Sequence, residues 1–309
     1  MSNIVGRFAP SPTGRMHLGN VFSALLSWLS AKSRGGQWLL RIEDIDRERS
    51  RQAYADLLMD DLQWLGLSWD GTPVYQSERS DIYEHYFKAL RQRGLTYPCY
   101  CTRADLLATQ APHESDGRVV YPGTCRPNTH PSTHPQPLPN GRGERKDGQA
   151  AMRLMVPNET VTFTDGHYGT HSVNLAEQVG DFIIRRKDGA WAYQLVVVID
   201  DALMGVTEVV RGEDLLLSAP QQIWLAQLLG FKAPEFIHLP LLCNKQGQRL
   251  SKRDQSMDMG TLRQQYTADE IIGRLAYYAK LLPQPEPIAP TDLISRFEWE
   301  KIPKQHLII

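Results

Sequence analysis

The feature that most constrains the fold is the pattern of residues 4–29. Residues 4–9 read as a short buried strand, and two prolines and a glycine between residues 10 and 14 then impose a turn. From Leu18 onward, apolar residues recur at the 3.6-residue spacing of an amphipathic helix. The start of such a helix has unpaired N–H groups and the positive end of the dipole, which suit a phosphate. Gly19 leaves room for a nucleotide to approach the backbone. The pattern predicts a strand, a tight loop and a helix with a phosphate site at its start.

Composition narrows the class of protein. The 309 residues suffice for a large core and two domains, and the net charge of −1 excludes a global basic field, so any RNA contact must be local. The longest apolar runs, such as residues 195–199, are too short to span a bilayer, and the first residues lack a signal-peptide pattern. Three of the four cysteines are clustered, which favours a metal site or reduced thiols over a secreted disulfide framework. A cytoplasmic protein without membrane contact is expected.

The first motif is Arg-Phe-Ala-Pro-Ser-Pro-Thr-Gly-Arg-Met-His-Leu-Gly-Asn, residues 7–20. It resembles the HIGH signature of class I aminoacyl-tRNA synthetases in the form of the glutamyl branch; the glutaminyl branch has Pro-Pro-Glu-Pro-Asn-Gly there. Asn20 departs from the family, which has His or Gly at that place. The resemblance implies an ATP site with His17, Gly19 and Asn20, and a glutamate site with Arg7, Ala9 and Ser11. It also implies that His17 is a catalytic residue. The alternative is an ordinary turn in which His17 is a solvated helix cap.

A second motif follows the next predicted strand. Residues 38–42 are apolar apart from Arg41 and lead into Glu43-Asp44-Ile45-Asp46, and open α/β sheets bind ligands at the carboxyl ends of their strands. The glutamyl family has Arg-Ile-Glu-Asp-Thr-Asp here, which implies that Glu43 holds the ammonium group of the amino acid. For Asp44 and Asp46, a solvated turn is an equally good interpretation.

The longest resemblance spans residues 181–214. Residues 181–198 read as a hairpin with an Asp-Gly turn. The glutamyl enzymes have a closely similar sequence in this stretch, and the resemblance implies that Tyr193 lies in the amino-acid pocket. Arg211 follows at the end of another strand. Arg7 and Arg211 make chemical sense together, because two guanidinium groups bind two carboxylates and cannot deprotonate. With Glu43 for the ammonium group, the pocket predicts glutamate over glutamine. Either arginine could instead belong to a structural ion pair.

Residues 245–253, Lys-Gln-Gly-Gln-Arg-Leu-Ser-Lys-Arg, resemble the KMSKS loop of class I synthetases, although Arg249 and Leu250 replace Lys and Met. The resemblance implies that Ser251 and Lys252 bind ATP. Lys252 supplies the cation that stabilises the developing pyrophosphate charge and is the second predicted catalytic residue.

The cysteines Cys99, Cys101 and Cys125 predict a structural zinc site, since thiolates are preferred zinc ligands and a closed site takes four. The candidates for the fourth ligand are Tyr121, His113, His130 and His134. Coordination chemistry alone favours a histidine, whereas a short paralogue group of the glutamyl family has Cys-x-Cys followed by Tyr-x-x-x-Cys, which favours Tyr121. Three buried free thiols are the alternative.

These motifs predict an α/β fold: a Rossmann-type class I synthetase catalytic core with an inserted zinc-bearing α+β subdomain of the acceptor type and a short helical C-terminal extension. The expected segments are the first catalytic half at 1–96, the insertion at 97–180, the second half with the KMSKS-like loop at 181–258, and the extension at 259–309. Helices are also expected near 50–65, 80–93 and 215–229. Residues 126–149, rich in Pro, Gly and His, predict a mobile loop.

The resemblance covers roughly residues 4–275 and implies activation of L-glutamate by ATP and Mg²⁺ to glutamyl-adenylate, with no need for tRNA. No anticodon-binding domain is expected after the catalytic core. That combination is similar to the branch of the family that transfers glutamate to queuosine in the anticodon of tRNA(Asp). A shortened glutamyl-tRNA synthetase acting on a tRNA 3′ end, another HIGH-bearing nucleotidyltransferase and a non-catalytic RNA-binding relative remain open. A monomer is expected.

Overall fold

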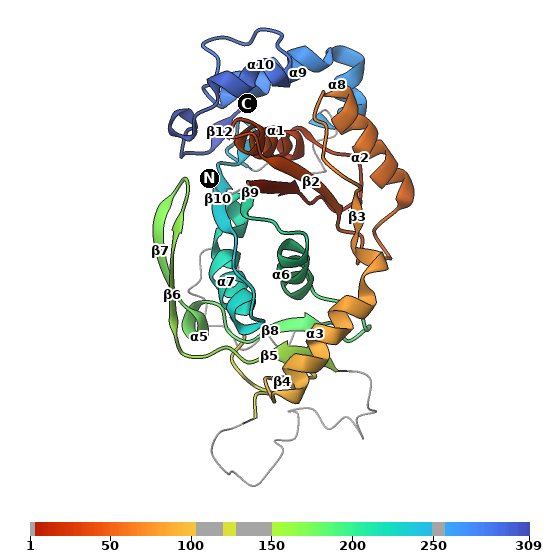
Figure 1. Ribbon diagram of the computed structural model, residues 1–309, viewed down its shortest axis with the longest axis vertical. Coiled ribbons are helices and arrows are strands. Elements are labelled where there is room, and N and C mark those ends of the chain that lie inside the picture. Colours follow the sequence, from red (N-terminus) through yellow and green to blue (C-terminus); the bar gives the residue numbers. More distant parts are fainter. Residues whose placement is uncertain (1–3, 103–119, 128–149, 249–256) are drawn as a thin grey trace. The chain divides into compact units, whose positions relative to one another are not determined.

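The computed structural model describes residues 4–102, 120–127, 150–248 and 257–309 (Figure 1). The chain forms two compact units, the first made of residues 1–80, 162–171 and 200–309 and the second of residues 81–161 and 172–199. The four segments expected from the sequence remain a prediction. Within the described residues, no helix is long and apolar enough to cross a membrane.

Two sets of parallel strands form the centre of the first unit. Strand β1 (Val5–Phe8) pairs with β2 (Gln37–Ile42), which pairs with β3 (Val74–Tyr75), and β9 (Glu208–Gly212) pairs with β10 (Glu235–Leu239). The N–H of Thr207 donates to the carbonyl of Val5 at 2.9 Å, so β9 begins beside β1. Strand β1 therefore has β2 on one side and β9 on the other, and such a switch point is where open α/β sheets bind ligands.

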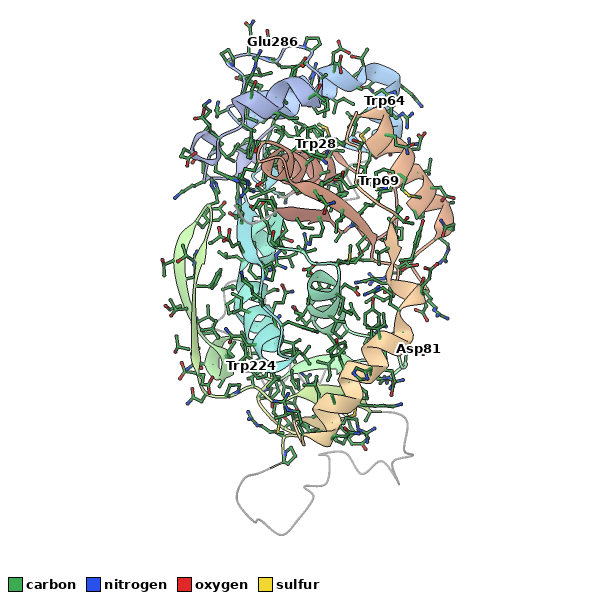
Figure 2. The ribbon with its side chains drawn as sticks, in the orientation of Figure 1. Trp28, Trp64, Trp69, Asp81, Trp224 and Glu286 are labelled. Atoms are coloured by element: carbon green, nitrogen blue, oxygen red, sulfur yellow. The ribbon has the colours of Figure 1, made fainter. Side chains whose placement is uncertain are left out.

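Helix α1 (Leu18–Lys32) makes the crossover from β1 to β2 that parallel strands require, and it confirms the predicted helix. Its Leu25, Leu26 and Leu29 are fully buried. Trp28, labelled in Figure 2, is also buried and donates to the carbonyl of Ser68 at 3.0 Å. The helix is therefore a central element of the core and not a surface helix.

The C-terminal residues complete this core. Helices α8 (Met259–Gln265), α9 (Ala268–Tyr278) and α10 (Pro290–Leu293) contribute buried apolar side chains to the cluster that contains α1. Strand β12 (Leu307–Ile308) pairs in parallel with β11 (Leu242–Cys243). Residues 259–309 are thus partly helical and belong to the core of the first unit.

Two helices of the first unit differ in how closely they follow the prediction. Helix α2 (Gln52–Trp64) has Arg51 as its N-cap and so begins at residue 52, within the range expected near 50–65. The helix expected at 215–229 is a 3₁₀ segment at Glu213–Ser218 followed by α7 (Ala219–Leu228). Pro220 lies in the first turn of α7, where its missing N–H costs no hydrogen bond, and this explains why the α-helix begins there. A short 3₁₀ turn, Gln76–Glu78, follows β3, and two more, Ile294–Arg296 and Trp299–Lys301, follow α10.

The second unit is built on an antiparallel sheet with the strand order β4 (Thr96–Cys99), β5 (Ala151–Leu154) and β8 (Phe182–Arg185). Helix α3 (Ser80–Gln92) begins where predicted and buries Tyr83, Phe87 and Leu90. Strands β6 (Thr160–Asp165) and β7 (Gly169–Asn174) pair with each other, and residues 162–171 of this pair belong to the first unit. Helix α5 (Leu175–Gln178) follows β7.

The returning strand predicted at 190–198 is wrong. After a single bridge between Arg185 and Trp191, the chain enters helix α6 (Tyr193–Leu203). Residues 195–199 are apolar, mostly β-branched and all buried. A helix buried on every side shows no 3.6-residue polar alternation, so periodicity cannot distinguish such a short run from a buried strand.

Candidate active site

Two buried arginines lie where the two sets of strands meet. Arg7 is on β1 and Arg211 on β9, with exposed fractions of 4% and 6%. The guanidinium of Arg7 approaches the carbonyl of Val210 at 3.5 Å and Asp201 Oδ1 at 3.3 Å. The first unit thus places the two predicted carboxylate-binding residues at neighbouring strand ends, next to the switch point.

A third buried arginine, Arg41 on β2, links the acidic groups of the site. Its Nη1 donates to Asp201 Oδ1 at 2.6 Å and its Nη2 to Glu43 Oε1 at 3.2 Å, and its Nε lies 3.9 Å from Asp200 Oδ2. Burial by itself would lower the pKa of Arg41, but the three carboxylates raise it above its usual value. Arg41 therefore stays charged and connects Glu43 with Asp201.

The two carboxylates that share Arg41 respond differently. Burial raises the pKa of Glu43 above its ordinary value, although Arg41 and Arg7 oppose the shift. For Asp201, burial acts in the same direction, but the charges of Arg41 and Arg7 prevail and lower its pKa. Asp201 thus stays ionised and balances the charges of Arg7 and Arg41. A cation placed beside Glu43 would stabilise the ionised form of its carboxylate.

Asp200 extends the network. Its carboxylate accepts hydrogen bonds from Arg79 Nε at 2.7 Å and Gln76 Nε2 at 2.8 Å. Sequence reasoning assigned no role to Arg41, Asp200 or Asp201. Two features of the sequence could have indicated these residues: Arg41 is a charged residue inside an apolar strand, and Asp200 and Asp201 directly follow an apolar run.

Arg211 has a different environment. It donates from Nε to His238 Nε2 at 3.0 Å, from Nη1 to Gln222 Oε1 at 2.7 Å and from Nη2 to the carbonyl of Leu215 at 3.1 Å. Its guanidinium lies 4.9 Å from the ring centre of Phe236. These three acceptors fix the orientation of the guanidinium, and none of them carries a negative charge.

His17 is the N-cap of α1, so the cap interpretation and the functional one describe the same residue. Its Nδ1 accepts the N–H of Gly19 at 3.2 Å, and its own N–H donates to Asn20 Oδ1 at 3.1 Å. This reciprocal pair explains the presence of Asn20. A Cβ at residue 19 would lie 3.1 Å from the His17 ring, which explains the glycine. With Nδ1 accepting, the neutral ring carries its proton on Nε2, a donor suited to a phosphate oxygen.

Ser251 and Lys252 lie outside the described residues. The described residues continue from Met257, and Asp258 forms an antiparallel bridge with His17 and caps α8. The N–H of Met259 donates to the carbonyl of Met16 at 2.9 Å. The segment that follows the KMSKS-like residues is therefore attached directly to the HIGH-like motif.

The other residues predicted for the glutamate pocket are Ala9, Ser11 and Tyr193. Ala9 is half-buried and Ser11 is exposed on the loop after β1. Tyr193 begins α6 in the second unit, so its position in the glutamate pocket remains a prediction.

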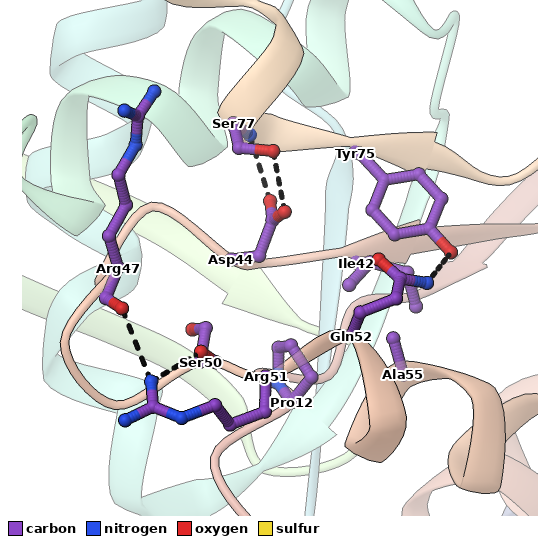
Figure 3. Close-up of a pocket in the computed structure, with 10 residues that line it drawn as sticks. All are labelled: Pro12, Ile42, Asp44, Arg47, Ser50, Arg51, Gln52, Ala55, Tyr75 and Ser77. Carbon is purple, nitrogen blue, oxygen red and sulfur yellow. Dashed lines mark hydrogen bonds between the residues drawn. The ribbon is translucent and has the colours of Figure 1, made fainter.

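A cavity of about 320 Å³ adjoins the end of β2 (Figure 3). Asp44 on its wall accepts hydrogen bonds from the Ser77 N–H at 2.8 Å and the Ser77 hydroxyl at 2.6 Å. Arg51 closes the loop before α2 by donating to three carbonyls, those of residues 47, 48 and 50. Asp44 thus has a structural partner as well as a position on the wall of a polar cavity, and Glu43 is not among the residues that line this cavity.

In the second unit, three thiols and a phenol converge. The sulfurs of Cys101 and Cys125 are 3.6 Å apart, and Tyr121 Oη lies 3.5 Å from Cys99 Sγ and 3.8 Å from Cys101 Sγ. A tetrahedral zinc site with such ligands has edges of about 3.5 to 3.8 Å. The hydrogen bond from Cys125 is the main cause that lowers the pKa of Cys99 to about 4, against the effect of burial. The three thiols and the phenol therefore fit a tetrahedral metal ion. The other candidates for the fourth ligand, His113, His130 and His134, lie outside the described residues.

The parallel strands, the capped helix after β1 and the buried charges at the switch point define the catalytic fold of a class I aminoacyl-tRNA synthetase. The chain belongs to the family described as tRNA synthetases class I (E and Q), catalytic domain, which matches residues 3–275. It is accordingly an enzyme of the ligase class.

Relatives of similar length are named glutamyl-Q tRNA(Asp) synthetase. The protein from Symbiobacterium thermophilum is 45% identical over 98% of this chain and 94% of its own length, and that from Nitratidesulfovibrio vulgaris is 43% identical over 99% and 95%. Among solved structures, the glutamate tRNA ligase of Elizabethkingia meningosepticum in complex with its amino acid is 28% identical, with a TM-score of 0.79 over 99% of this chain and 67% of that one.

Proposed function

We propose that this enzyme activates L-glutamate with ATP, without needing a tRNA, and then transfers the glutamyl group to queuosine in the anticodon of tRNA(Asp). The observation that carries glutamate activation is the placement of Arg7, Arg211 and Glu43 at adjoining strand ends of the first unit. A substrate with two carboxylates and one ammonium group requires two fixed cations and one anion, and these residue types supply them.

In the first step, the α-carboxylate of glutamate attacks the α-phosphorus of ATP, the bond to the β-phosphate oxygen breaks, and glutamyl-adenylate and pyrophosphate form. No side chain acts as a covalent nucleophile, so positioning and charge stabilisation provide the acceleration. The His17 Nε2–H and the positive end of the α1 dipole, with Gly19 and Asn20 beside them, are suited to the ATP phosphates. Ser251, Lys252 and a phosphate-bound Mg²⁺ are assigned to the departing pyrophosphate.

In the second step, a hydroxyl of the acceptor attacks the carbonyl carbon of the adenylate and AMP leaves. Two observations support queuosine as that acceptor: the relatives matched over 94–97% of their own length carry the name glutamyl-Q tRNA(Asp) synthetase, and a polar cavity is lined by Ile42 and Asp44, which flank Glu43 in the sequence. About 320 Å³ is within the size range of small-molecule sites. Charging of a tRNA 3′ end is the second candidate, because the similar solved structure is a glutamate tRNA ligase.

The experiment has two parts. Glutamate-dependent exchange of pyrophosphate into ATP is expected in the absence of tRNA; if exchange required tRNA, the first step would be wrong as stated. Labelled glutamate is then offered with tRNA from queuosine-replete cells and from queuosine-deficient cells. Labelling of the first pool alone supports queuosine, whereas equal labelling of both pools establishes a tRNA 3′ end as acceptor.

For the second unit, we propose a structural zinc ion bound by Cys99, Cys101, Tyr121 and Cys125, which would add the free energy of metal binding to folding. Tyr121→Phe removes the oxygen ligand and is expected to lower zinc affinity by about tenfold or more. The measurement is competition with a chromophoric chelator, with Tyr86→Phe as control. Equal affinity of wild type and Tyr121→Phe would exclude tyrosine as a ligand, and absence of zinc from the wild type would exclude the site.

A further inference from the structure

A buried histidine and aspartate lie behind Arg211. His238 on β10 is the direct register partner of Arg211 on β9 and is fully buried. Its Nε2 receives the Arg211 Nε–H at 3.0 Å, and its Nδ1 lies 2.6 Å from Asp165 Oδ2. The three side chains form one continuous hydrogen-bonded row within the first unit.

The aspartate at the end of this row is held rigidly. Asp165 Oδ1 accepts the backbone N–H groups of His167 at 3.0 Å and Tyr168 at 2.9 Å, and both carboxylate oxygens approach the N–H of His238. Burial raises the pKa of Asp165, but the hydrogen bonds from His238 and from these backbone donors outweigh that effect and lower the pKa below its ordinary value, so the carboxylate stays ionised. Asp165 is thus a fixed acceptor for the histidine ring.

The geometry determines the state of His238. A guanidinium has only donors, so the Nε2 that faces Arg211 must be the acceptor, and the ring proton must be on Nδ1, where it donates to Asp165. Burial, with the charge of Arg211, also lowers the pKa of His238, which favours the neutral ring.

We infer that His238, oriented by Asp165, is a positioning residue that fixes the guanidinium of Arg211 for the substrate carboxylate while leaving its positive charge in place. This inference rests on the proposed glutamate pocket. A carboxylate in place of the imidazole would hold Arg211 equally well but would compete with the substrate for its charge. A neutral imidazole supplies the direction of the hydrogen bond without that competition.

Two substitutions separate the two halves of the row. In His238→Gln, the side-chain carbonyl takes the place of Nε2 and still accepts from Arg211. In His238→Asn, the shorter amide takes the place of Nδ1 and still donates to Asp165, but no acceptor reaches Arg211. Both side chains are uncharged and polar, so each is the control of the other for general disturbance of the core.

The experiment measures KM for glutamate, KM for ATP and kcat in pyrophosphate exchange, together with the midpoint of thermal unfolding. His238→Asn is expected to raise KM for glutamate by about tenfold, the loss that follows when a charged hydrogen bond is removed, with KM for ATP unchanged. His238→Gln is expected to stay within about twofold of the wild type, since it restores the acceptor.

Equal increases of KM for glutamate in both variants, or parallel increases for glutamate and ATP, would overturn the inference, because a purely structural histidine predicts those results. If the wild type itself showed no glutamate-dependent exchange, the proposed function would be wrong and the inference would fall with it. An active wild type with unaffected variants rejects only the role of His238.

Discussion

Arg7 and Arg211 lie at neighbouring strand ends of one unit, yet chemically different partners hold them. Arg7 belongs to a network of alternating charges in which Asp201 is shared with Arg41, and Arg41 also contacts Glu43. Arg211 is held by an imidazole, an amide and a carbonyl. The first arrangement uses buried charges that depend on one another, whereas the second uses dipoles that would survive the loss of the arginine.

The contrast has an energetic consequence. Removing one member of a buried ion-pair network leaves the other charges desolvated without compensation, which costs much more than the net stability the pair provides. Removing a cation from neutral acceptors leaves only unsatisfied dipoles, which cost about 1 to 3 kcal/mol. Substitutions on the β1–β2 side of the site should therefore lower the stability of the fold. Substitutions on the β9–β10 side should chiefly weaken substrate binding.

The largest effect is expected for Arg41→Met, which leaves Glu43 and Asp201 buried without their shared cation. The free energy of unfolding should fall by about 3 to 5 kcal/mol, measured by urea denaturation. Arg49→Met is the control, because Arg49 pairs with Asp46 at the surface, where its side chain is 74% exposed. That exposed pair should contribute no more than about 1 kcal/mol. Similar losses in both variants would contradict the distinction between the two sides of the site.

Arg211→Ala is expected to act chiefly on substrate binding and less on stability. Loss of a charged, two-point contact with a carboxylate should lower kcat/KM for glutamate in pyrophosphate exchange by about 100-fold. KM for ATP should be unchanged, and the unfolding free energy should change less than in Arg41→Met. Unaltered exchange would remove Arg211 from the pocket, whereas a fall in stability equal to that of Arg41→Met would remove the contrast with Arg7.

The sequence predicted the local elements and several residues of the site, but not the hydrogen bonds that join those residues. The strand, loop and helix at residues 5–32 follow from local periodicity and turn residues, and the coarse α/β synthetase fold follows from the motifs. The partners of Arg7 and Arg41 did not follow, because Asp201 is separated from them by 194 and 160 residues along the chain. Hydrogen bonds across such distances depend on how strands are ordered, and no local pattern records that order.

Helix α6 illustrates the same limit from the side of local structure. Its β-branched, apolar residues favour a strand by propensity, and tertiary burial overrides that preference. Since Asp200 and Asp201 are on this helix, the wrong secondary structure also concealed the acidic half of the network. His238 was missed for a similar reason, because a histidine inside an apolar strand gives no indication of its partner on the next strand.

Gln222→Glu would make the environment of Arg211 resemble that of Arg7. The new carboxylate would occupy the place of the amide oxygen that accepts from Arg211 at 2.7 Å and would form an ion pair with it. KM for glutamate should rise about tenfold, because the substrate then competes with an internal anion for the same cation. Gln222→Met is the control that removes the acceptor without adding charge, and it should raise KM less. If Gln222→Glu left KM unchanged, the neutrality of the acceptors around Arg211 would have no bearing on binding.

The smallest expected effect comes from pH and concerns Glu43, which must be ionised to bind an ammonium group. Because burial raises its pKa in the free enzyme, Glu43 becomes protonated at a higher pH than an exposed glutamate, despite the nearby charges of Arg41 and Arg7. As pH falls through that raised value, kcat/KM for glutamate should decrease, since kcat/KM reports the free enzyme. Asp201 has a lowered pKa and stays ionised, so the charge beside Arg7 does not change over the same range. Glu43→Gln should give a lower profile without this acidic decrease. A decrease of the same shape in Glu43→Gln would assign the titration to another group and leave Glu43 without a role in binding the ammonium group.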